Sequence, residues 1–434
     1  MPTCDAEGQD RKADELEPAT DAAQTIARYR AHVSEGMAML AELMEAHVEV
    51  RSEGTRIWDE EGTEYLDCGG YGVFILGHRY PRVVAAVHAQ LDRHPMSSRV
   101  LLNGELAHAA EQLARVAPTG LDYVFFTNSG AEATELAIKL ARVNGRRRLI
   151  STHGGFHGKT NGALSVTGKA LFRDPFQPGL VDVTFIAYDD VDALEAELAA
   201  GEPAAVILEP IQAEGGVIIP ADGFLQAVRE LCDSHGALLI LDEVQTGLGR
   251  LGSWWGSDRE GVVPDILLVG KGLSGGVVPV AAVVATPDAY RTISEDPLLH
   301  SSTYAGNPLA MSAASAAITA LEEDDIIPKA QALGARLLDE LQALKEDHAP
   351  TVLGDVRGRG LLLAFDFNED HFAGDFVLEL VNRRVIVSTS LNANRVVRLH
   401  PAAIMDEDDI QWLLGAMRES ADAVEERFGR GSDA

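Results

Sequence analysis

The feature that most constrains this fold is a series of short apolar runs, separated by stretches with the spacing of amphipathic helices. The runs have strand length and cover residues 123–127, 205–208, 237–241 and 265–269. Strands that are apolar on both faces are typical of a parallel sheet covered by helices on both sides. The sequence therefore predicts an α/β fold with a mainly parallel sheet at its centre.

The segment after the first run shows the helical spacing clearly. Its small and apolar residues recur every three or four positions, so that they fall on one stripe of a helix: Ala133, Leu136, Ala137, Leu140 and Ala141. This part of the chain is predicted to be a strand-loop-helix unit.

The two ends of the chain follow other patterns. Residues 48–67 alternate in polarity around Gly54 and Gly62, which predicts a small antiparallel unit, and order is expected to begin near Ala22. From about Asp325 the pattern is helix, strands and helix. We therefore expect a disordered acidic tail (1–20), an N-terminal segment of a small domain (21–75), a large domain (76–325) and the C-terminal part of the small domain (326–434).

Composition narrows the class of protein. Lys and Arg total 36 against 67 Asp and Glu, and the resulting net charge of −31 would repel nucleic acid and anionic membranes. No apolar run approaches the length of a membrane span and residues 1–20 lack the pattern of a signal peptide, so we expect a cytoplasmic protein. Cys4, Cys68 and Cys232 lie far apart without CxxC spacing, which predicts neither disulfides nor a metal site.

Polar residues follow three of the apolar runs, at the positions where ligands bind in open α/β sheets. Residues 128–132 open a helix, whose free backbone N–H groups and dipole suit a phosphate. Asp242 follows the third run, where a buried carboxylate needs a cationic partner such as a protonated pyridine nitrogen. Lys271 stands between Gly270 and Gly272, where the backbone must pass close to a bulky group and burial would lower the pKa of the amine.

Each of these features alone has a simpler structural explanation. Ser129 could be an ordinary helix cap, Asp242 a member of a structural ion pair, and Lys271 a solvated loop residue. Their occurrence together, each at the end of a strand, favours a common site.

Six longer strings carry a resemblance to a known family: SGAEATELAIKLAR, GGFHGKTNGALSVTG, ILEPIQAEGGV, LILDEVQTGLGR, LLVGKGLSGG and HSSTYAGNPLA. The chain resembles the class III (ω-) aminotransferases from about Asp59 to Arg398. The segments GGYGVFILGHRYP, FRDPFQP and VIVSTSLNANRVVRLHP look most similar to putrescine, or diamine, aminotransferases. The resemblance implies fold type I, with a mainly parallel seven-stranded sheet in a large domain and a small α+β domain. It also implies pyridoxal 5′-phosphate (PLP) as cofactor and a homodimer with shared active sites.

The resemblance assigns roles to matching residues. Lys271 would hold PLP as a Schiff base and move protons, while Asp242 would bind the pyridine nitrogen. The other cofactor contacts would be Ser129, Gly130 and Ala131 at the phosphate, Phe156 and Val244 on the two ring faces, Gln245 at the ring hydroxyl, and Thr303 at the phosphate of the partner subunit. Glu209 and His157 match motif positions, and the sequence leaves their roles open.

The substrate contacts have alternatives. Arg398 would bind the α-carboxylate of glutamate or 2-oxoglutarate, and Glu214 would pair with it when the bound amine lacks this group. Without the resemblance, a solvated ion pair would be the preferred explanation of these two residues. Tyr71 and Phe74 would line the distal end of the pocket or pack in the core. We expect transfer of an amino group between a terminal amine such as putrescine and 2-oxoglutarate. Alternative substrates are acetylornithine, ornithine, 4-aminobutyrate and a specialised-metabolite aldehyde. Aminomutases and racemases use the same scaffold and are a further alternative.

Overall fold

The computed structural model describes residues 21–98, 100–179 and 182–429, so the predicted acidic tail lies outside the described part. The chain divides into a smaller unit, formed by residues up to 52 together with 56–65, and a larger unit, formed by 53–55 together with 66–434. The predicted domain boundaries near residues 75 and 325 stay a prediction.

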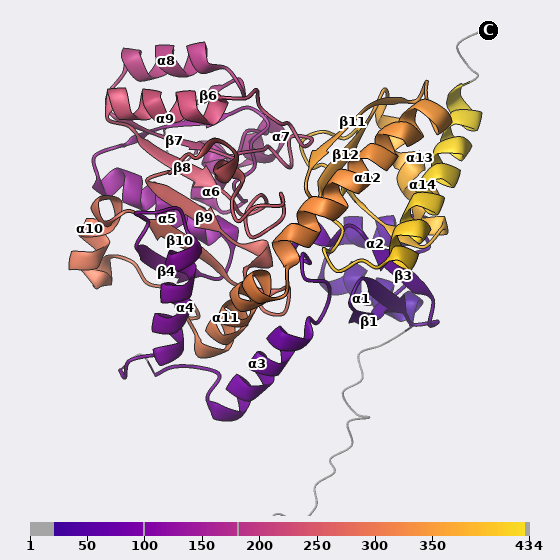
Figure 1. The fold of residues 1–434 in the computed structure, drawn as a ribbon, viewed down its shortest axis with the longest axis horizontal. Helices are drawn as coiled ribbons and strands as arrows, with labels where there is room; N and C mark the ends of the chain where they lie inside the picture. The colour runs from indigo at the N-terminus through magenta and orange to yellow at the C-terminus, as the bar shows by residue number, and fades with distance from the viewer. Residues whose placement is uncertain (1–20, 99, 180–181, 430–434) are drawn as a thin grey trace, which may run out of the picture. The chain divides into compact units, whose positions relative to one another are not determined.

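A seven-stranded sheet forms the centre of the larger unit (Figure 1). All neighbouring strands from β9 to β6 are parallel, whereas β10 runs antiparallel to both β4 and β9. The strands follow the order β4 (Tyr123–Thr127), β10 (Ala281–Ala285), β9 (Ile266–Val269), β8 (Leu238–Asp242), β7 (Ala204–Leu208), β5 (Arg148–Thr152) and β6 (Val183–Ile186). The predicted α/β class and mainly parallel sheet are confirmed.

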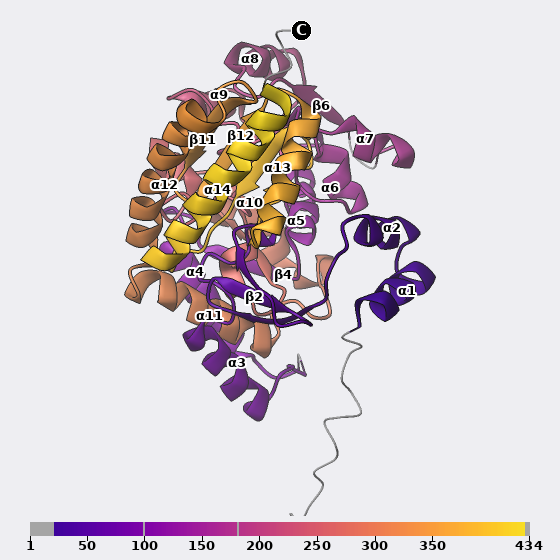
Figure 2. The same ribbon diagram turned by 90° about the vertical axis from the view of Figure 1, so that its right-hand side faces the viewer.

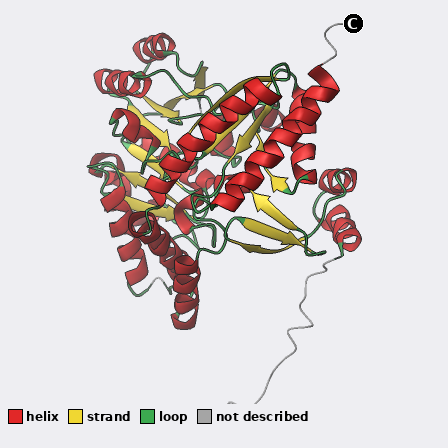
Figure 3. Ribbon diagram, turned by 45° about the vertical axis from the view of Figure 1, so that its right-hand side comes forward, coloured by secondary structure: helices red, strands yellow, loops and turns green. Residues whose placement is uncertain are grey.

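The strands are apolar on both faces because each face meets a separate layer of helices. In β7, Val206 and Leu208 belong to one apolar core, whereas Ala205 and Ile207 belong to another. The first core includes residues of α4 (Gly104–Val116), α8 (Val191–Ala200), α9 (Phe224–His235) and α11 (Pro308–Glu323), and the second includes residues of α5 (Gly130–Val143) and α10 (Pro287–Glu295). Figure 3 shows the helices in red around the yellow strands. The predicted stripe of α5 is buried in the second core, as its spacing indicated.

The C-terminal part of the larger unit holds a second, antiparallel sheet. Its strands follow the order β11 (Leu353–Arg359), β12 (Leu362–Phe367), β15 (Val396–Leu399) and β14 (Ser388–Thr389). Three helices lie side by side against it in Figure 2: α12 (Ile326–His348), α14 (Glu407–Phe428) and α13 (Asp370–Asn382). The helix, strands and helix predicted after Asp325 are therefore present.

The larger unit also contains short elements that complete its connections. They are α3 (Pro81–Arg93), α6 (Asn161–Val166), α7 (Ala170–Arg173), β13 (Val385–Ile386) and the 3-10 turns η2 (Gly70–Gly72), η3 (Asp174–Phe176), η4 (Gly256–Glu260), η5 (Lys271–Ser274) and η6 (Pro297–Leu299). Helix α11 packs against α3 and α4, and β13 pairs in parallel with Leu66 and Asp67.

The smaller unit contains two helices and most of the predicted short strands, of which residue 53 and residues 66–67, like Gly54, belong to the larger unit. Helix α1 (Ala22–His32) begins after Asp21, whose carboxylate accepts a hydrogen bond from the Gln24 N–H at 2.8 Å. Helix α2 (Glu35–Leu43) precedes β1 (Glu49–Glu53), β2 (Arg56–Asp59) and β3 (Glu64–Asp67), which neighbour one another in that order. Gly54 and Gly62 have positive φ angles of 59° and 81°, which suits the predicted turns.

Candidate active site

Most of the predicted site residues line one cavity of about 490 Å³, which we call the site cavity. It lies beyond the carboxyl ends of β4, β8 and β9, as the strand-end argument predicts. The predicted residues that line it are Ser129, Gly130, Ala131, Phe156, Glu214, Asp242, Val244, Gln245 and Lys271, together with His157 and Glu209.

The N-terminus of α5 forms one wall of the site cavity. The Ser129 hydroxyl accepts a hydrogen bond from the Glu132 N–H at 3.2 Å, so Ser129 is a helix cap as well as a lining residue. A Cβ atom on Gly130 would lie 3.2 Å from both methyl groups of Val244. Glycine therefore lets Val244 pack against the start of the helix. Ser129, Gly130 and Ala131 line the cavity beside the first free N–H groups of α5, where an anion is favoured.

Asp242 ends β8 and is held on both carboxylate oxygens. Its Oδ2 atom lies 2.8 Å from Nδ1 of the buried His157, and its Oδ1 atom accepts the Val244 N–H at 3.1 Å. Burial opposes the charge of His157, but the hydrogen bond and the charges of Asp242 and Glu209 outweigh it and raise the pKa of the imidazole. His157 therefore fixes the orientation of the Asp242 carboxylate.

Glu209 connects the loop of Phe156 to the end of β7. Its two carboxylate oxygens accept the N–H groups of Phe156 and Ala213, at 3.0 and 3.1 Å. Burial is the largest influence on Glu209 and raises the pKa of its carboxyl group to about 7. The charge of His157 lowers this pKa, and the charge of Asp242 raises it further. The sequence left the roles of Glu209 and His157 open, and both contribute here by holding other site residues.

Lys271 begins the turn η5 directly after β9 and Gly270. Its φ angle of 45° is in the left-handed region, which costs free energy for a residue with a side chain. Burial is the largest influence on its amine and lowers the pKa, with a smaller raising effect from Glu214 and Asp242. A strained lysine with a lowered pKa beside a cavity is typical of a functional site.

Glu214 and Arg398 form a buried ion pair rather than a solvated one. Their exposed fractions are 7% and 2%, and Glu214 Oε1 lies 2.9 Å from Arg398 Nη2. The other oxygen of Glu214 accepts the Leu391 N–H at 2.9 Å, and Arg398 Nη2 also donates to the Thr389 carbonyl at 3.2 Å. Arg398 Nε and Nη1 are buried and have no hydrogen-bond partner among the described residues. Two guanidinium nitrogens thus have no acceptor among the described residues.

Two further buried residues near this site were not predicted from the sequence. His400 Nε2 lies 2.7 Å from Gln245 Nε2. Arg250 is 2% exposed and donates to the backbone carbonyls of Pro401 at 2.7 Å, Leu361 at 3.2 Å and Gly72 at 3.4 Å. Each contact joins residues more than 100 positions apart, which local sequence patterns do not report.

Four predicted residues do not line the site cavity: Arg398, whose partner Glu214 does line it, and three others, Tyr71, Phe74 and Thr303. Tyr71 is 78% exposed, which excludes core packing within the described chain, and Phe74 stacks on the His78 ring with 3.8 Å between centroids. Val73, which lies between them, does line the cavity. Thr303 lines a separate cavity of about 700 Å³ beside the N-terminus of α4, which we call the Thr303 cavity. The proposed roles of all three stay predictions.

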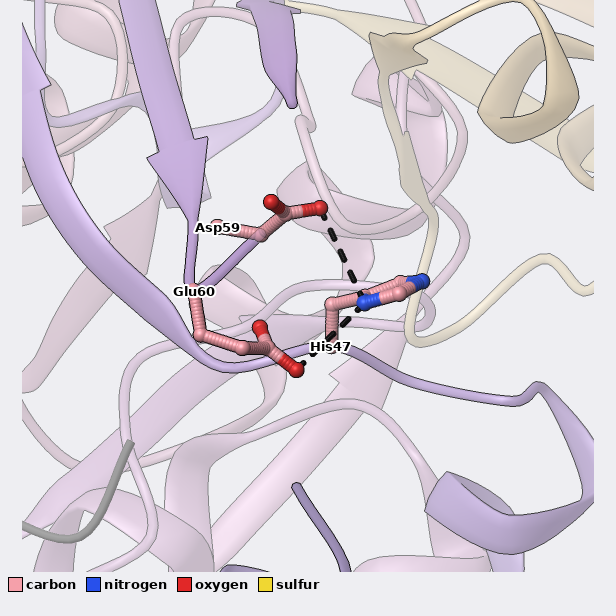
Figure 4. A group of neighbouring side chains, drawn as sticks. All are labelled: His47, Asp59 and Glu60. Carbon is pink, nitrogen blue, oxygen red and sulfur yellow. Dashed lines mark ion pairs between the residues drawn. The ribbon is translucent and has the colours of Figure 1, made fainter. Parts of the chain in front are cut away.

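The smaller unit contains a group of side chains with metal-ligand chemistry, His47, Asp59 and Glu60 (Figure 4). His47 Nδ1 lies 3.7 Å from Asp59 and 3.4 Å from Glu60. Asp59 Oδ1 already accepts the N–H groups of Glu61 and Thr63, and Glu60 accepts the Val48 N–H. These hydrogen bonds explain the group as a tie between neighbouring segments.

Two other predictions concern features outside the site. Cys68 and Cys232 are buried free thiols, and Cys4 lies outside the described residues. Among the helices that the structure describes, none combines the length and apolar content that a membrane span requires.

Comparison with known proteins agrees with the geometry of the site. Residues 41–420 match the model of the family described as Aminotransferase class-III. The chain belongs to the class III aminotransferases. The resemblance in the sequence is thereby confirmed at the level of the family.

Solved structures of other aminotransferases are similar over nearly the whole chain. The ornithine aminotransferase of Toxoplasma gondii is 34% identical, with a TM-score of 0.87, 94% of this chain covered and 96% of that chain covered; PLP partially occupies its active site. An (S)-enantioselective omega-transaminase from Thermomicrobium roseum is 28% identical, with a TM-score of 0.86 and coverages of 93% and 99%. A transaminase from the marine bacterium Virgibacillus is 25% identical, with a TM-score of 0.87 and coverages of 94% and 100%.

As a class III aminotransferase the protein uses PLP, and the site cavity fits this cofactor. The N-terminus of α5, which lines the cavity through Ser129, Gly130 and Ala131, suits a phosphate, and the buried Asp242 suits a cationic ring nitrogen. Gln245 Oε1 and His157 Nε2 are buried without hydrogen-bond partners among the described residues, as expected where a polar ligand completes a site.

Proposed function

We propose that this aminotransferase moves an amino group between a terminal amine, such as a putrescine-like diamine, and 2-oxoglutarate. The observation that carries the proposal is the buried Glu214–Arg398 pair beside the site cavity, in which two guanidinium nitrogens have no partner among the described residues. When bound, PLP supplies an electron sink that stabilises negative charge at the carbon bearing the amine.

The residues of the site cavity would divide the work of holding the cofactor and moving protons. Ser129, Gly130 and Ala131 would bind the phosphate at the N-terminus of α5, and Asp242 would bind the ring nitrogen. Phe156 and Val244 would enclose the ring, and Gln245 would meet its hydroxyl. Lys271 would anchor the cofactor through its amine and then move a proton to and from the substrate carbon, for which a lowered pKa is suited.

The Glu214–Arg398 pair would act as a gate between two kinds of substrate. With a carboxylate substrate, Arg398 would turn its free N–H groups to the α-carboxylate, a geometry that a guanidinium binds strongly. With an amine that lacks this carboxylate, Glu214 would keep the arginine neutralised, because a buried unpaired charge is costly. Glutamate and a simple amine could then use one site in turn.

The charges that line the site cavity support a donor without a carboxylate at its distal end. Glu209, Glu214 and Asp242 contribute carboxylates, whereas Lys271 is the only lysine or arginine among the described lining residues. A second ammonium group is therefore easier to accommodate there than a second carboxylate. This favours a diamine.

Ornithine is a second candidate donor. Its support is the similarity to the ornithine aminotransferase of Toxoplasma gondii over 94% of this chain. Ornithine also presents a terminal amine, so the same gate would serve it.

We also propose that the active enzyme is a homodimer in which Thr303 contributes to the partner subunit's site. The Thr303 cavity is bordered by exposed apolar side chains, including Leu101 and Leu102, and the nearby Val100, Leu298 and Tyr304 are also exposed. Apolar surface of this kind is typical of a protein interface. A second copy of the chain is the occupant that the proposed shared site requires.

A panel of amine donors with 2-oxoglutarate as acceptor tests the proposed substrate. We expect glutamate formation to be fastest with putrescine or cadaverine, slower with ornithine, and slowest with N-acetylornithine and 4-aminobutyrate. The quantity to compare is kcat/KM for each donor at saturating 2-oxoglutarate. A clear preference for ornithine would replace the diamine proposal with the second candidate.

A further inference from the structure

We propose that His400 is a positioning residue that fixes the side-chain amide of Gln245 in the orientation needed to meet the cofactor. The inference rests on the proposed contact between Gln245 and PLP, and it adds a residue for which the sequence suggested no role.

The two residues come from different sheets and meet behind the wall of the site cavity. Gln245 lies three positions after the end of β8 and lines the site cavity, whereas His400 follows β15 and is not among its lining residues. Both are buried, and Gln245 Nε2 lies 2.7 Å from His400 Nε2. This is a full hydrogen bond in a place that water does not reach.

The partners determine where the protons are. With the amide in this orientation its nitrogen donates, so His400 Nε2 accepts and the ring proton is on Nδ1. Nδ1 lies 3.4 Å from the Ser388 hydroxyl, which can receive that proton in a hydrogen bond. Burial and the nearby charges of Arg398, Arg250 and Lys271 hold the pKa of His400 well below its usual range, so the ring stays neutral and remains an acceptor.

The Gln245 amide is also enclosed by backbone. Gly72 has a φ angle of 72°, and a Cβ atom on it would lie 2.4 Å from Gln245 Nε2 and 3.1 Å from the His400 ring. Arg250 donates to the Gly72 carbonyl at 3.4 Å and so holds this segment in place. The amide therefore lies between His400 and the backbone of Gly72, with little room for another rotamer.

This enclosure leaves one polar atom of Gln245 to be satisfied. Oε1 is buried and has no hydrogen-bond partner among the described residues, whereas one of the two Nε2 hydrogens is used by His400. A polar group held in one orientation before a ligand arrives binds it at a lower entropic cost. Without His400, the amide could rotate about its terminal bond and exchange its oxygen and nitrogen.

Three variants separate orientation from packing. His400→Met removes the acceptor and keeps a buried side chain of similar length, His400→Gln returns a polar group near the position of Nε2, and Leu399→Met is a control on the opposite face of β15. The readouts are the dissociation constant of PLP, measured by titrating the cofactor-free protein, and the absorption spectrum of the bound cofactor across pH.

We expect His400→Met to weaken PLP binding roughly 3- to 10-fold, as the loss of one buried hydrogen bond implies, and to shift the absorption spectrum. His400→Gln should recover affinity to within about twofold, and Leu399→Met should match the wild type. Gln245→Ala should also weaken binding, and the double variant with His400→Met should be no worse than Gln245→Ala, because the histidine would act only through the glutamine.

The outcomes distinguish this inference from the proposal on which it rests. If Gln245→Ala weakens PLP binding and His400→Met does not, His400 fills space and the inference fails alone. If Gln245→Ala leaves PLP binding unchanged, the proposed contact of Gln245 fails and takes the inference with it. If His400→Met does not fold, His400→Gln is compared with His400→Asn, whose side chain cannot reach the Nε2 position. The inference would be overturned if His400→Gln bound PLP no more tightly than His400→Asn.

Discussion

At the scale of single residues, the chemistry depends on buried groups whose charges are set by their neighbours. Burial lowers the pKa of the Lys271 amine and thereby raises the fraction that is neutral and able to take a proton. Lys271→Ala should abolish amino transfer while leaving the fold intact, because it removes the anchor and proton carrier but little of the core. Glutamate formation measures the loss of amino transfer, and circular dichroism checks that the fold is intact. Transfer near the wild-type rate would refute the role of Lys271.

The gate gives a second prediction at this scale. Arg398→Ala should slow the half-reactions with glutamate and 2-oxoglutarate far more than that with putrescine, because only the carboxylate substrates need the guanidinium. Loss of such a contact costs about 2–5 kcal/mol, which is a large factor in kcat/KM. Glu214→Ala should act in the opposite sense and favour glutamate. Single-turnover rates for each half-reaction decide, and equal losses for both substrates would exclude the gate.

At the scale of elements, the end of a helix serves both stability and binding. Ser129 caps α5 at the site cavity, and Thr286 caps α10 away from it with a similar hydrogen bond of 3.3 Å. Ser129→Ala and Thr286→Ala should each lower the free energy of unfolding of the cofactor-free protein by about 0.5–2 kcal/mol. Only Ser129→Ala should also weaken PLP binding. Urea unfolding and PLP titration of both variants test this prediction. If Ser129→Ala binds PLP as tightly as Thr286→Ala, Ser129 acts only as a helix cap.

The elements also show what the sequence could predict. The four apolar runs became β4, β7, β8 and β9 within a residue or so, because a strand buried on both faces must be apolar throughout. The direction of β10 was not predictable, since an antiparallel strand in the interior of a sheet has the same apolar composition as its parallel neighbours. Lys271 and Asp242 could be proposed from the sequence because they stand at or just after the end of a strand. The contacts of His400 and Arg250 join distant parts of the chain, which local patterns do not reveal.

At the scale of the whole molecule, the proposed homodimer makes each active site depend on two chains. Thr303→Ala should lower PLP affinity at the partner subunit's site, and Lys271→Ala disables its own. Mixing the two variants and allowing subunit exchange should give hybrids in which one site carries both lesions and the other carries neither. At low PLP, the rate of glutamate formation by such a hybrid should therefore recover toward half the rate of the wild-type dimer, because one of its two sites is intact. Subunit exchange is verified by the size of the dimer and by labelling of the subunits. If glutamate formation does not recover after exchange, the result would argue against a shared site.

Arg250 has a consequence for how relatives of this chain can diverge. All three of its partners are main-chain carbonyls, at Gly72, Leu361 and Pro401, and a carbonyl is present whatever side chain the residue bears. The identities of residues 361 and 401 can therefore drift without breaking the hydrogen bonds, whereas an inserted or deleted residue beside them would move the acceptor by more than 3 Å. Natural variation and laboratory libraries should thus keep these hydrogen bonds through apolar substitutions of similar size at residues 361 and 401, and should reject any change in the length of these two segments.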